Sequence, residues 1–316
     1  MVMLVTSLAD VAAAQQRFEY SQIHMGVQVR VVLYATDEAV AKAAAESAFR
    51  RFAELDDILS DYRRDSELNR LCARAGAGPV PVSQDLYTVL ERAREIAKRT
   101  GGAFDPTAGP LVALWRRTKQ SGELPSQEEL RRAQALVGWS RMLLDPRRRT
   151  VELLEPGMQL DLGGIAKGYA CDEALRAVNT AGVRSALVEA GGDIAVSEPP
   201  PGTEGWAVRI PSLGTTLLVS NCGLSSSGDE VQYVEIQGAR YSHILDPRTG
   251  LGLTESSFGN RARPGRVHHR PMGDGALHSG GALPLLGGGV GRSEGSLGSE
   301  PLGTLVLKKN GARYWT

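Results

Sequence analysis

The sequence is poor in cysteine, and its charges of either sign balance. Three cysteines occur in 316 residues, and they are far apart with no C-x-x-C pair: Cys72, Cys171 and Cys222. Neither a disulfide framework nor a zinc site is therefore expected. Lys plus Arg and Asp plus Glu both number 36, so the net charge is zero. No global basic field exists to attract nucleic acid, and an anion site would need specific residues and backbone amides.

Long apolar runs are missing as well, since no stretch approaches the ~20 residues that a membrane-spanning helix needs. Residues 1–15 are mildly apolar and end in a small-residue run typical of a secretory signal, although Asp10 interrupts them. Residues 1–20 are therefore predicted to be a signal remnant or a disordered terminus. We expect export to the periplasm or association with the membrane surface, with a cytoplasmic location as the alternative.

Helical and strand periodicities are both present. Apolar residues at helical spacing predict helices over residues 37–60, 84–100 and 168–181. Alternating or β-branched apolar runs predict strands at residues 27–34, 185–190, 206–211, 216–220, 231–237 and 239–244. Several strands mixed with few helices favour an α+β architecture.

The segment LDLGGIAKG, residues 160–168, combines groups that suit a phosphate with a nearby metal. Asp161 stands at the end of a predicted strand, and Gly163-Gly164 allows a ligand to approach the backbone closely. Lys167 stands at the start of a predicted helix, where free amides and the helix dipole favour anions. The segment is not a P-loop, because G-x-x-x-x-G-K-[ST] is absent. A glycine turn with a solvated lysine is the alternative interpretation.

Two further segments could contact an aromatic ligand. The loop GGAFDPTAGP, residues 101–110, could present Phe104 and backbone amides to a planar ring, or could simply end a helix and turn. In LSDYRRDSEL, residues 59–68, Tyr62 could stack on a ring, or the stretch could be a surface loop before a helix N-cap.

The segment HILDPRTG, residues 243–250, ends a predicted strand with His, Asp and Arg together. His243 could accept a proton near neutral pH, or it could be a hydrogen-bonded residue of an Asp-Pro turn. A Gly-Gly-Asp turn at residues 191–193 follows another strand and suits a tight turn beside a site.

The order of these segments resembles the ApbE family, the FAD:protein FMN transferases. The resemblance runs from Met25-Gly26 through LSDYRRDSEL, GGAFDPTAGPLVALW, LDLGGIAKGYACDEAL, ALVEAGGDI and SSSGD to HILDPRTG. It implies an α+β, ApbE-like (T-fold-related) flavin transferase fold of mixed sheets with packed helices. It also implies a single domain over residues 21–316, with FAD in a cleft and magnesium beside the pyrophosphate.

The resemblance implies a role for each matching residue. Met25 and Tyr62 would line the flavin or adenine pocket, and Gly164 would offer its backbone carbonyl to magnesium. The other residues implied to contact FAD are Ala103, Phe104, Asp105, Asp161, Lys167, Leu245 and Asp246. The residues Ser227, Gly228 and Asp229 would complete the wall that His243–Asp246 forms. His243 or a carboxylate such as Asp161 would accept the proton of the acceptor hydroxyl.

The implied activity is a magnesium-dependent transfer. A Thr or Ser hydroxyl of a target flavoprotein attacks the phosphorus on the FMN side of FAD, and AMP leaves. The expected target is a flavoprotein subunit of a membrane redox complex. Two alternatives are a non-catalytic FAD-binding protein and an FAD pyrophosphatase that uses water as the acceptor.

Residues 258–303 depart from the family pattern. They hold 13 glycines in 46 residues, and they lack the S-V-T-V and A-D-x-x-A-T-A run that supplies the family's other magnesium ligands. Our hypothesis for the gap is a shifted reading frame, which would force Trp at Met272-Gly273 and permit T-T-D-x-W-A-T-A-L across residues 268–276. Normal patterning returns near Thr304.

Overall fold

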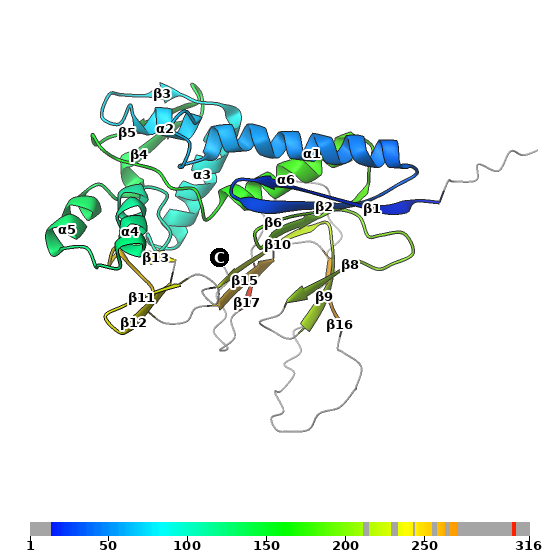
Figure 1. Ribbon diagram of the computed structural model, residues 1–316. Helices are drawn as coiled ribbons and strands as arrows, with labels where there is room; N and C mark the ends of the chain where they lie inside the picture. Colours follow the sequence, from blue (N-terminus) through cyan, green and yellow to red (C-terminus); the bar gives the residue numbers. More distant parts are fainter. Residues whose placement is uncertain are drawn as a thin grey trace, which may run out of the picture.

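The central element of the fold is a seven-stranded antiparallel sheet in the order β1-β2-β6-β7-β10-β15-β17 (Figure 1). The computed structural model describes residues 14–210, 215–228, 233–242 and 244–254, and the strands at 258–262, 266–270 and 305–307. The strands of this sheet are β1 (Gln16–His24), β2 (Val27–Ala35), β6 (Ser185–Ala190), β7 (Asp193–Val196), β10 (Cys222–Gly228), β15 (Phe258–Ala262) and β17 (Leu305–Leu307).

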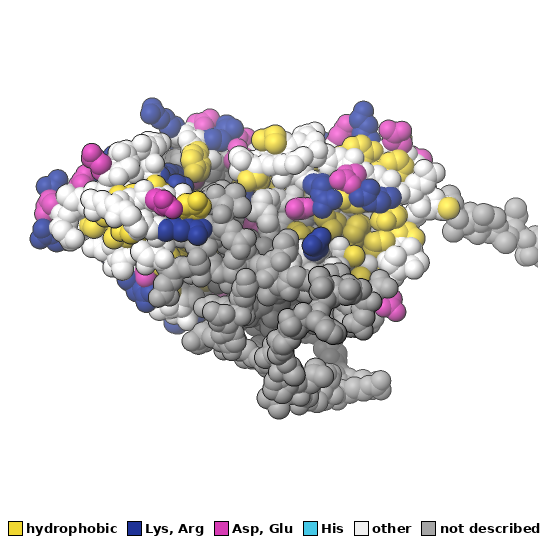
Figure 2. Space-filling model, turned by 60° about the horizontal axis from the view of Figure 1, so that its bottom comes forward, with side chains coloured by type: hydrophobic (Ala, Val, Ile, Leu, Met, Phe, Trp, Pro, Cys, Tyr) yellow, Lys and Arg dark blue, Asp and Glu magenta, His cyan; other side chains and the backbone are white. Residues whose placement is uncertain are grey.

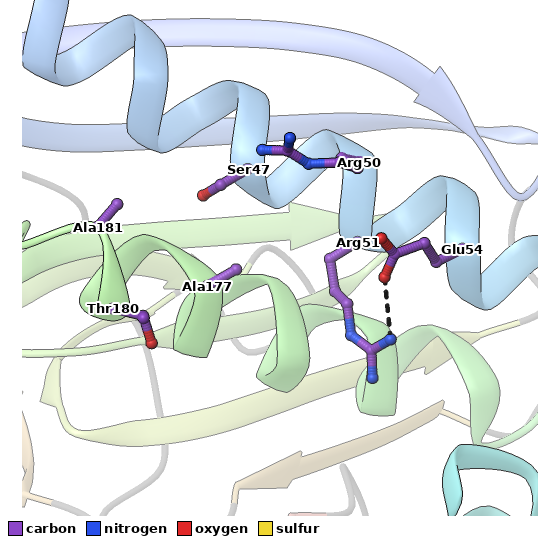
Figure 3. A pocket seen from close by; sticks show the side chains of 7 residues that line it. All are labelled: Ser47, Arg50, Arg51, Glu54, Ala177, Thr180 and Ala181. Atoms are coloured by element: carbon purple, nitrogen blue, oxygen red, sulfur yellow. Dashed lines mark hydrogen bonds and ion pairs between the residues drawn. The ribbon is translucent and has the colours of Figure 1, made fainter. Parts of the chain in front are cut away.

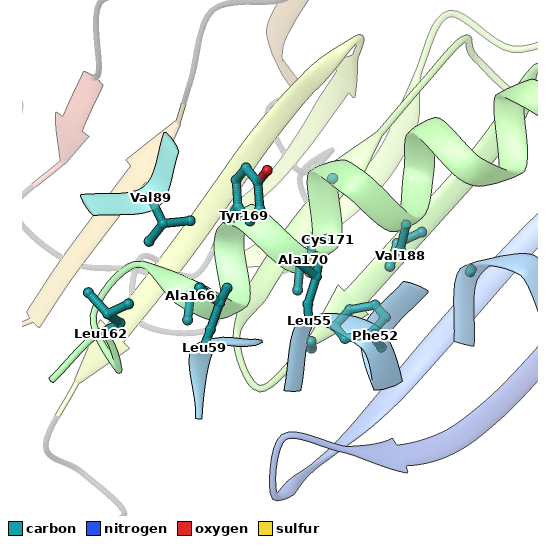
Figure 4. Close-up of a cluster of buried hydrophobic side chains, with 14 of the residues drawn as sticks. Phe52, Leu55, Leu59, Val89, Leu162, Ala166, Tyr169, Ala170, Cys171 and Val188 are labelled. Atoms are coloured by element: carbon teal, nitrogen blue, oxygen red, sulfur yellow. The ribbon is translucent and has the colours of Figure 1, made fainter. Parts of the chain in front are cut away.

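Two helices, α1 (Glu38–Leu59) and α6 (Ala166–Thr180), cover one face of the sheet (Figure 1). Alanines on their facing surfaces let the helices approach closely, while Phe52 and Leu55 fill the space between them and the sheet (Figure 4). Val31 and Leu33 of β2 point into the same core. This layer forms the larger hydrophobic core of the molecule.

A smaller core lies on the opposite face of the sheet. There the three-stranded sheet of β8 (Trp206–Ile210), β9 (Thr215–Ser220) and β16 (Arg266–Arg270) supplies Trp206 and Val219. Val32 of β2 and Leu187 of β6 join this second core. Because successive strand residues point to opposite faces, β2 serves both cores with alternate side chains.

The remaining elements extend from one end of these layers. Three helices, α3 (Gln84–Arg99), α4 (Gly109–Ser121) and α5 (Gln127–Ala135), accompany the small sheet of β3 (Val80–Pro81), β4 (Met142–Asp145) and β5 (Thr150–Leu153). The other short elements are α2 (Glu67–Cys72), η1 (Trp139–Arg141), β11 (Tyr233–Ile236), β12 (Ala239–Ser242), β13 (Leu245–Asp246) and β14 (Leu251–Gly252).

The α+β prediction is confirmed, and the three long helices begin and end within two residues of their predicted bounds. Helices α4 and α5 were not predicted. Helix α4 buries an apolar stripe that includes Leu111, Leu114 and Trp115, but it begins inside the glycine- and proline-rich loop at Gly109-Pro110, which is typical of a turn. Helix α5 buries Leu130 but no other residue of the helix, so it shows no strong apolar stripe. Strand β1 was also missed.

The ends of the chain bear on two predictions. Residues 16–20 of the predicted N-terminal segment belong to β1, and residues 1–13 lie outside the described residues. Within the 258–303 segment the described residues are β15 and β16, and residues 271–303 lie outside. Of the described helices, none has both the length and the apolar character to span a membrane.

The surface and the cysteines agree with the composition. On the face that Figure 2 shows, the basic and acidic side chains of the described residues are interspersed, without a continuous field of one sign. Cys171 and Cys222 are buried, whereas Cys72 is half-buried and accepts a hydrogen bond from the Leu160 amide at 3.3 Å. All three lie within the described residues and form no disulfide.

Candidate functional site

The LDLGG turn and the GGAFDPTAGP loop lie side by side, although 49 residues separate them in the sequence. The Asp161 amide donates to the Pro106 carbonyl at 2.8 Å, and Ala108 and Gln159 form a parallel bridge. Gly109 lies so close to Gln159 that a Cβ on it would be 2.7 Å from the Gln159 carbonyl oxygen. The two motifs therefore form one surface.

Asp161 belongs to a cluster that also contains Asp61 and Arg116 from α4. The Arg116 Nη2 atom lies 2.5 Å from Asp61 Oδ2 and 3.2 Å from Asp161 Oδ2, and Asp161 Oδ1 accepts from the Gly163 amide at 2.9 Å. Burial, followed by the negative charge of Asp61, raises the pKa of Asp161, while the Gly163 amide and Arg116 oppose the rise. Two carboxylates therefore share one guanidinium.

Tyr62 presents an aromatic ring beside this cluster. The ring is 75% exposed, and the guanidinium carbon of Arg116 lies 4.1 Å from its centroid. This cation–π contact fixes one face of an otherwise accessible ring. The predicted stacking residue is thus placed next to Asp161, where a ring-bearing ligand could reach both.

Phe104 packs on the Gly163-Gly164 turn. A Cβ added at Gly164 would be 3.1 Å from Phe104 Cε2, so the absence of a side chain there allows the ring to lie close to the backbone. Ala103 beside it is exposed. Phe104, Ala103 and the Gly164 backbone are therefore neighbours on one surface.

Asp105 has a structural role that sequence reasoning did not anticipate. Its carboxylate is buried, and Oδ1 accepts from the Thr107 amide at 2.8 Å and from the Thr107 hydroxyl at 2.6 Å. Its other oxygen, Oδ2, accepts from the Trp139 amide at 3.1 Å. The side chain therefore fixes the loop that carries Phe104, and a contact between this residue and a ligand would come from its backbone.

Lys167 lies in the first turn of α6, and its Nζ donates to the Gly163 carbonyl at 3.3 Å. The N-cap residue Ile165 makes no side-chain hydrogen bond to the helix. A Cβ at Gly191 would be 3.5 Å from Lys167 Cε and 3.0 Å from Val27 Cγ1. Lysine, helix N-terminus and the Gly-Gly-Asp turn therefore meet, an arrangement that favours an anion.

Met25 occupies the turn of the β1–β2 hairpin, next to Val27. Met25 and Gly26 have φ of 50° and 72°, and His24 pairs with Val27. A two-residue turn with positive φ at both positions is the type I′ hairpin, which matches strand twist. Met25 packs against the larger core, so the hairpin end lies beside the Lys167 region.

The HILDPRTG segment docks on α4 and α5. A Cβ at Gly250 would be 2.9 Å from both Leu111 and Leu130, and the Gln134 side chain donates to the Arg248 carbonyl at 3.1 Å. Leu245 is half-buried here. Because α4 also carries Arg116, one helix joins this segment to the Asp161 cluster.

Within that segment Asp246 is engaged by Arg248. The carboxylate accepts from the Arg248 amide at 2.9 Å and from its guanidinium at 2.7 Å, and these hydrogen bonds lower the pKa of Asp246. The Asp246 carboxylate is therefore bonded to a residue of its own segment. His243 and Asp229 lie outside the described residues, whereas Ser227 and Gly228 belong to β10.

The described residues offer few ligands for a magnesium ion. Among them no group of three or more His, Cys, Asp or Glu side chains is placed to hold a metal ion. Two carboxylates beside the LDLGG turn, Asp61 and Asp161, both contact Arg116. The Gly164 carbonyl is the remaining predicted ligand, and magnesium prefers several oxygen ligands in octahedral geometry.

A surface groove of about 380 Å³ lies elsewhere, between α1 and the C-terminal end of α6 (Figure 3). Its lining residues are Ser47, Arg50, Arg51, Glu54, Ala177, Thr180 and Ala181. Lys167 is ten residues before Ala177 on the same helix, roughly 15 Å along its axis. The groove is therefore separate from the candidate site.

Together the fold and the site define an α+β protein that gathers an exposed aromatic ring, a lysine at a helix N-terminus and a shielded carboxylate pair, groups suited to a ligand with rings and phosphates. The chain belongs to the ApbE family, whose model matches residues 25–257.

Relatives of known activity and known structure agree with this assignment. The chain is 31% identical over 252 residues to the FAD:protein FMN transferase of Chlamydia muridarum, covering 79% of each chain. It is 33% identical over 262 residues to that of Treponema pallidum, covering 76% of this chain and 72% of the relative.

Two solved structures share the fold. The ApbE protein of Thermotoga maritima superposes with a TM-score of 0.69 at 29% identity, covering 78% of this chain and 81% of that one. The flavin transferase ApbE of Vibrio cholerae gives a TM-score of 0.68 at 26% identity, covering 79% and 82%. The ApbE-like fold predicted from the motifs is confirmed.

Proposed function

We propose that this chain is an FAD:protein FMN transferase, which moves the FMN half of FAD onto a Thr or Ser hydroxyl of a target flavoprotein and releases AMP. The observation that carries the proposal is the convergence of the ordered family motifs on one surface. Pro106 belongs to the GGAFDPTAGP loop, whereas Asp161 and Lys167 belong to LDLGGIAKG, and the hydrogen bond from the Asp161 amide to the Pro106 carbonyl joins the two segments. Relatives that bear this activity match about three quarters of the chain.

In the transfer, the acceptor oxygen forms a bond to the phosphorus on the FMN side, and the bond from that phosphorus to the bridging oxygen of AMP breaks. Lys167 at the N-terminus of α6 offsets charge on the phosphoryl oxygens, which is the main catalytic effect available to phosphoryl transfer. Tyr62 stacks on a ring of the substrate, and Phe104 lines the surface on which the substrate lies.

The acceptor hydroxyl must lose a proton as it attacks. Asp161 and His243 are the two proposed acceptors of this proton. The raised pKa of Asp161 makes it a stronger base than an ordinary carboxylate, which suits the role. Asp161 lies beside Arg116, which would stabilise the carboxylate before the proton arrives.

Magnesium is part of the proposal on the strength of the family resemblance. The Gly164 carbonyl would be its ligand from the described residues, and the ion would supply positive charge to the phosphoryl oxygens. The carboxylate and hydroxyl ligands expected from an Asp-x-x-x-Thr run are missing from the printed sequence. No step is therefore assigned to the metal.

Incubation with FAD, magnesium and a threonine-bearing acceptor flavoprotein tests the proposal. Covalent flavin fluorescence on the acceptor after denaturing electrophoresis is the expected result. Release of AMP without labelling would instead show hydrolysis by water, and FAD binding with neither product would show a flavin-binding protein without catalysis. Either of these two outcomes contradicts transfer.

The acceptor and its compartment also belong to the proposal. We propose a flavoprotein subunit of a membrane redox complex as the target, and export to the periplasm as the location. The small-residue run at Ala12-Ala13-Ala14 supports export. A C-terminal reporter that is active outside the cytoplasm tests this, and an exclusively cytoplasmic reporter would contradict it.

A further inference from the structure

Arg116 contacts both a loop and a turn that the proposed function assigns to FAD. It projects from α4, seven residues after the first residue of that helix. Its Nη2 atom reaches Asp61 in the loop after α1 and Asp161 in the LDLGG turn, at 2.5 and 3.2 Å. Its guanidinium carbon lies 4.1 Å from the Tyr62 ring centroid.

We propose that Arg116 is a positioning residue for FAD, because one guanidinium joins the loop carrying Tyr62 to the turn carrying Asp161. It holds the ring and the carboxylate in place before the ligand arrives. The inference rests on the proposed function, since it takes both groups as FAD contacts.

The shape of the guanidinium explains why an arginine is needed. Its planar face can lie on an aromatic ring while its edge donates hydrogen bonds in the plane to carboxylates. A lysine ammonium could neutralise Asp61 or Asp161, but it has no plane with which to do both. The Asp61 and Asp161 side chains are only 18% and 17% exposed, so solvent screens their contacts with Arg116 weakly.

The backbone of the Tyr62 loop does not depend on Arg116. The Asn69 side chain donates to the carbonyls of Asp61 and Arg63, at 3.1 and 2.7 Å. Loss of Arg116 therefore releases the Tyr62 ring and the Asp61 side chain while the loop backbone stays anchored. The released groups must then be ordered when FAD binds, which weakens binding.

The test compares FAD affinity with turnover in three variants of the full chain. We expect Arg116→Gln to raise the FAD Kd, measured by flavin fluorescence, and the KM for FAD about tenfold, equivalent to about 1.4 kcal/mol. The kcat should fall by a smaller factor, and Arg116→Lys should recover part of the affinity. Arg117→Gln is the matched control, because Arg117 is the next residue on α4 and pairs with Glu129 instead.

A further variant guards against misfolding. Arg116→Gln leaves two carboxylates without their cation, so Asp61→Asn combined with Arg116→Gln removes one of the charges and should fold while keeping the raised KM. An unchanged Kd and KM in both variants would overturn the inference even if the wild type transfers FMN. A loss confined to kcat would also overturn it.

The transferase proposal and the inference about Arg116 can fail independently of each other. A wild-type chain that binds FAD but transfers nothing would contradict the transferase proposal, and the comparison of FAD Kd would still decide the role of Arg116. A wild-type chain that binds no FAD would overturn both.

Discussion

Lys167 and Asp105 illustrate how differently two polar residues of the same site behave. Lys167 makes one side-chain hydrogen bond, to the Gly163 carbonyl, and stands where an anion would bind. Asp105 is buried and accepts from Thr107 and Trp139. We propose a role in chemistry for Lys167, whereas the hydrogen bonds of Asp105 hold the loop, a distinction that the residue types alone do not show.

Lys167→Gln should lower kcat/KM for FAD by at least about tenfold, because a charge beside the phosphoryl oxygens contributes most in the transition state. Thermal stability should stay unchanged, since the side chain makes a single contact at the surface. Steady-state kinetics and a melting curve check both points. Lys119→Gln, on the exposed end of α4, is the control and should leave activity as it is. Equal losses in the two variants would contradict the role.

Asp105→Ala should destabilise the fold by about 2–3 kcal/mol or more, because it leaves buried donors of Thr107 and Trp139 without acceptors. Urea unfolding measures the change. Asp65→Ala is the comparison, since Asp65 makes a 3.5 Å surface pair with Arg63 and its loss should change stability by less than about 1 kcal/mol. Similar values for both variants would show that the Asp105 carboxylate does not hold the loop.

The contents of the site were partly predictable at this scale. Asp161, Lys167 and Phe104 were identified because glycines surround each of them in short motifs. Arg116 was not, because its partner Asp161 is 45 residues away and no local pattern connects them. The assignment of Asp105 changed for a similar reason, since its partner Trp139 comes from a distant segment.

At the scale of elements, α4 organises the candidate site. One side of the helix carries Arg116 to the Asp161 cluster, while Trp115 packs against Tyr241 of β12 with ring centroids 5.6 Å apart. The helix was missed in the sequence because its first residues, Gly109-Pro110, are typical of a turn. Proline is in fact favoured in the first turn of a helix, where no amide partner is lost.

Gly252→Ala should destabilise the protein by about 1–3 kcal/mol and loosen the HILDPRTG segment from α4. A Cβ there would be 2.3 Å from the Ser242 carbonyl oxygen and 2.5 Å from Trp115 Cζ2, so backbone or ring must move. Urea unfolding and tryptophan fluorescence report the change. Thr254→Ala, at an exposed position two residues later, should be neutral. If Gly252→Ala leaves the free energy of unfolding unchanged, the close contact of Gly252 with Ser242 and Trp115 is absent.

At the scale of the whole molecule, the pattern of strands and helices was enough to predict an α+β protein, and the order of motifs was enough to predict the family. Strand order was not predictable, because β2 pairs with β6 and β7 pairs with β10, and each pair joins segments far apart in the sequence. Local periodicity also could not predict the two cores that share this sheet. It shows that side chains alternate between the two faces of a strand, but it does not show which element packs against each face.

The 258–303 segment carries a prediction about the gene. We expect its nucleotide sequence to hold an open shifted frame that encodes an Asp-x-x-x-Thr run and returns before Thr304. A protein made from that frame should lose transfer activity on treatment with EDTA and recover it with magnesium. A stop codon in the shifted frame, or the absence of the Asp-x-x-x-Thr run, would contradict the prediction.

The central claim is group transfer from FAD to a protein hydroxyl. The most direct measurement quantifies AMP and acceptor-bound FMN in one reaction of the full chain, with FAD, magnesium and a flavoprotein whose acceptor Thr is either intact or replaced by Val. We predict one AMP for each FMN attached to the intact acceptor, and neither product with the Val variant. AMP released equally with both acceptors, without attached FMN, would contradict the account.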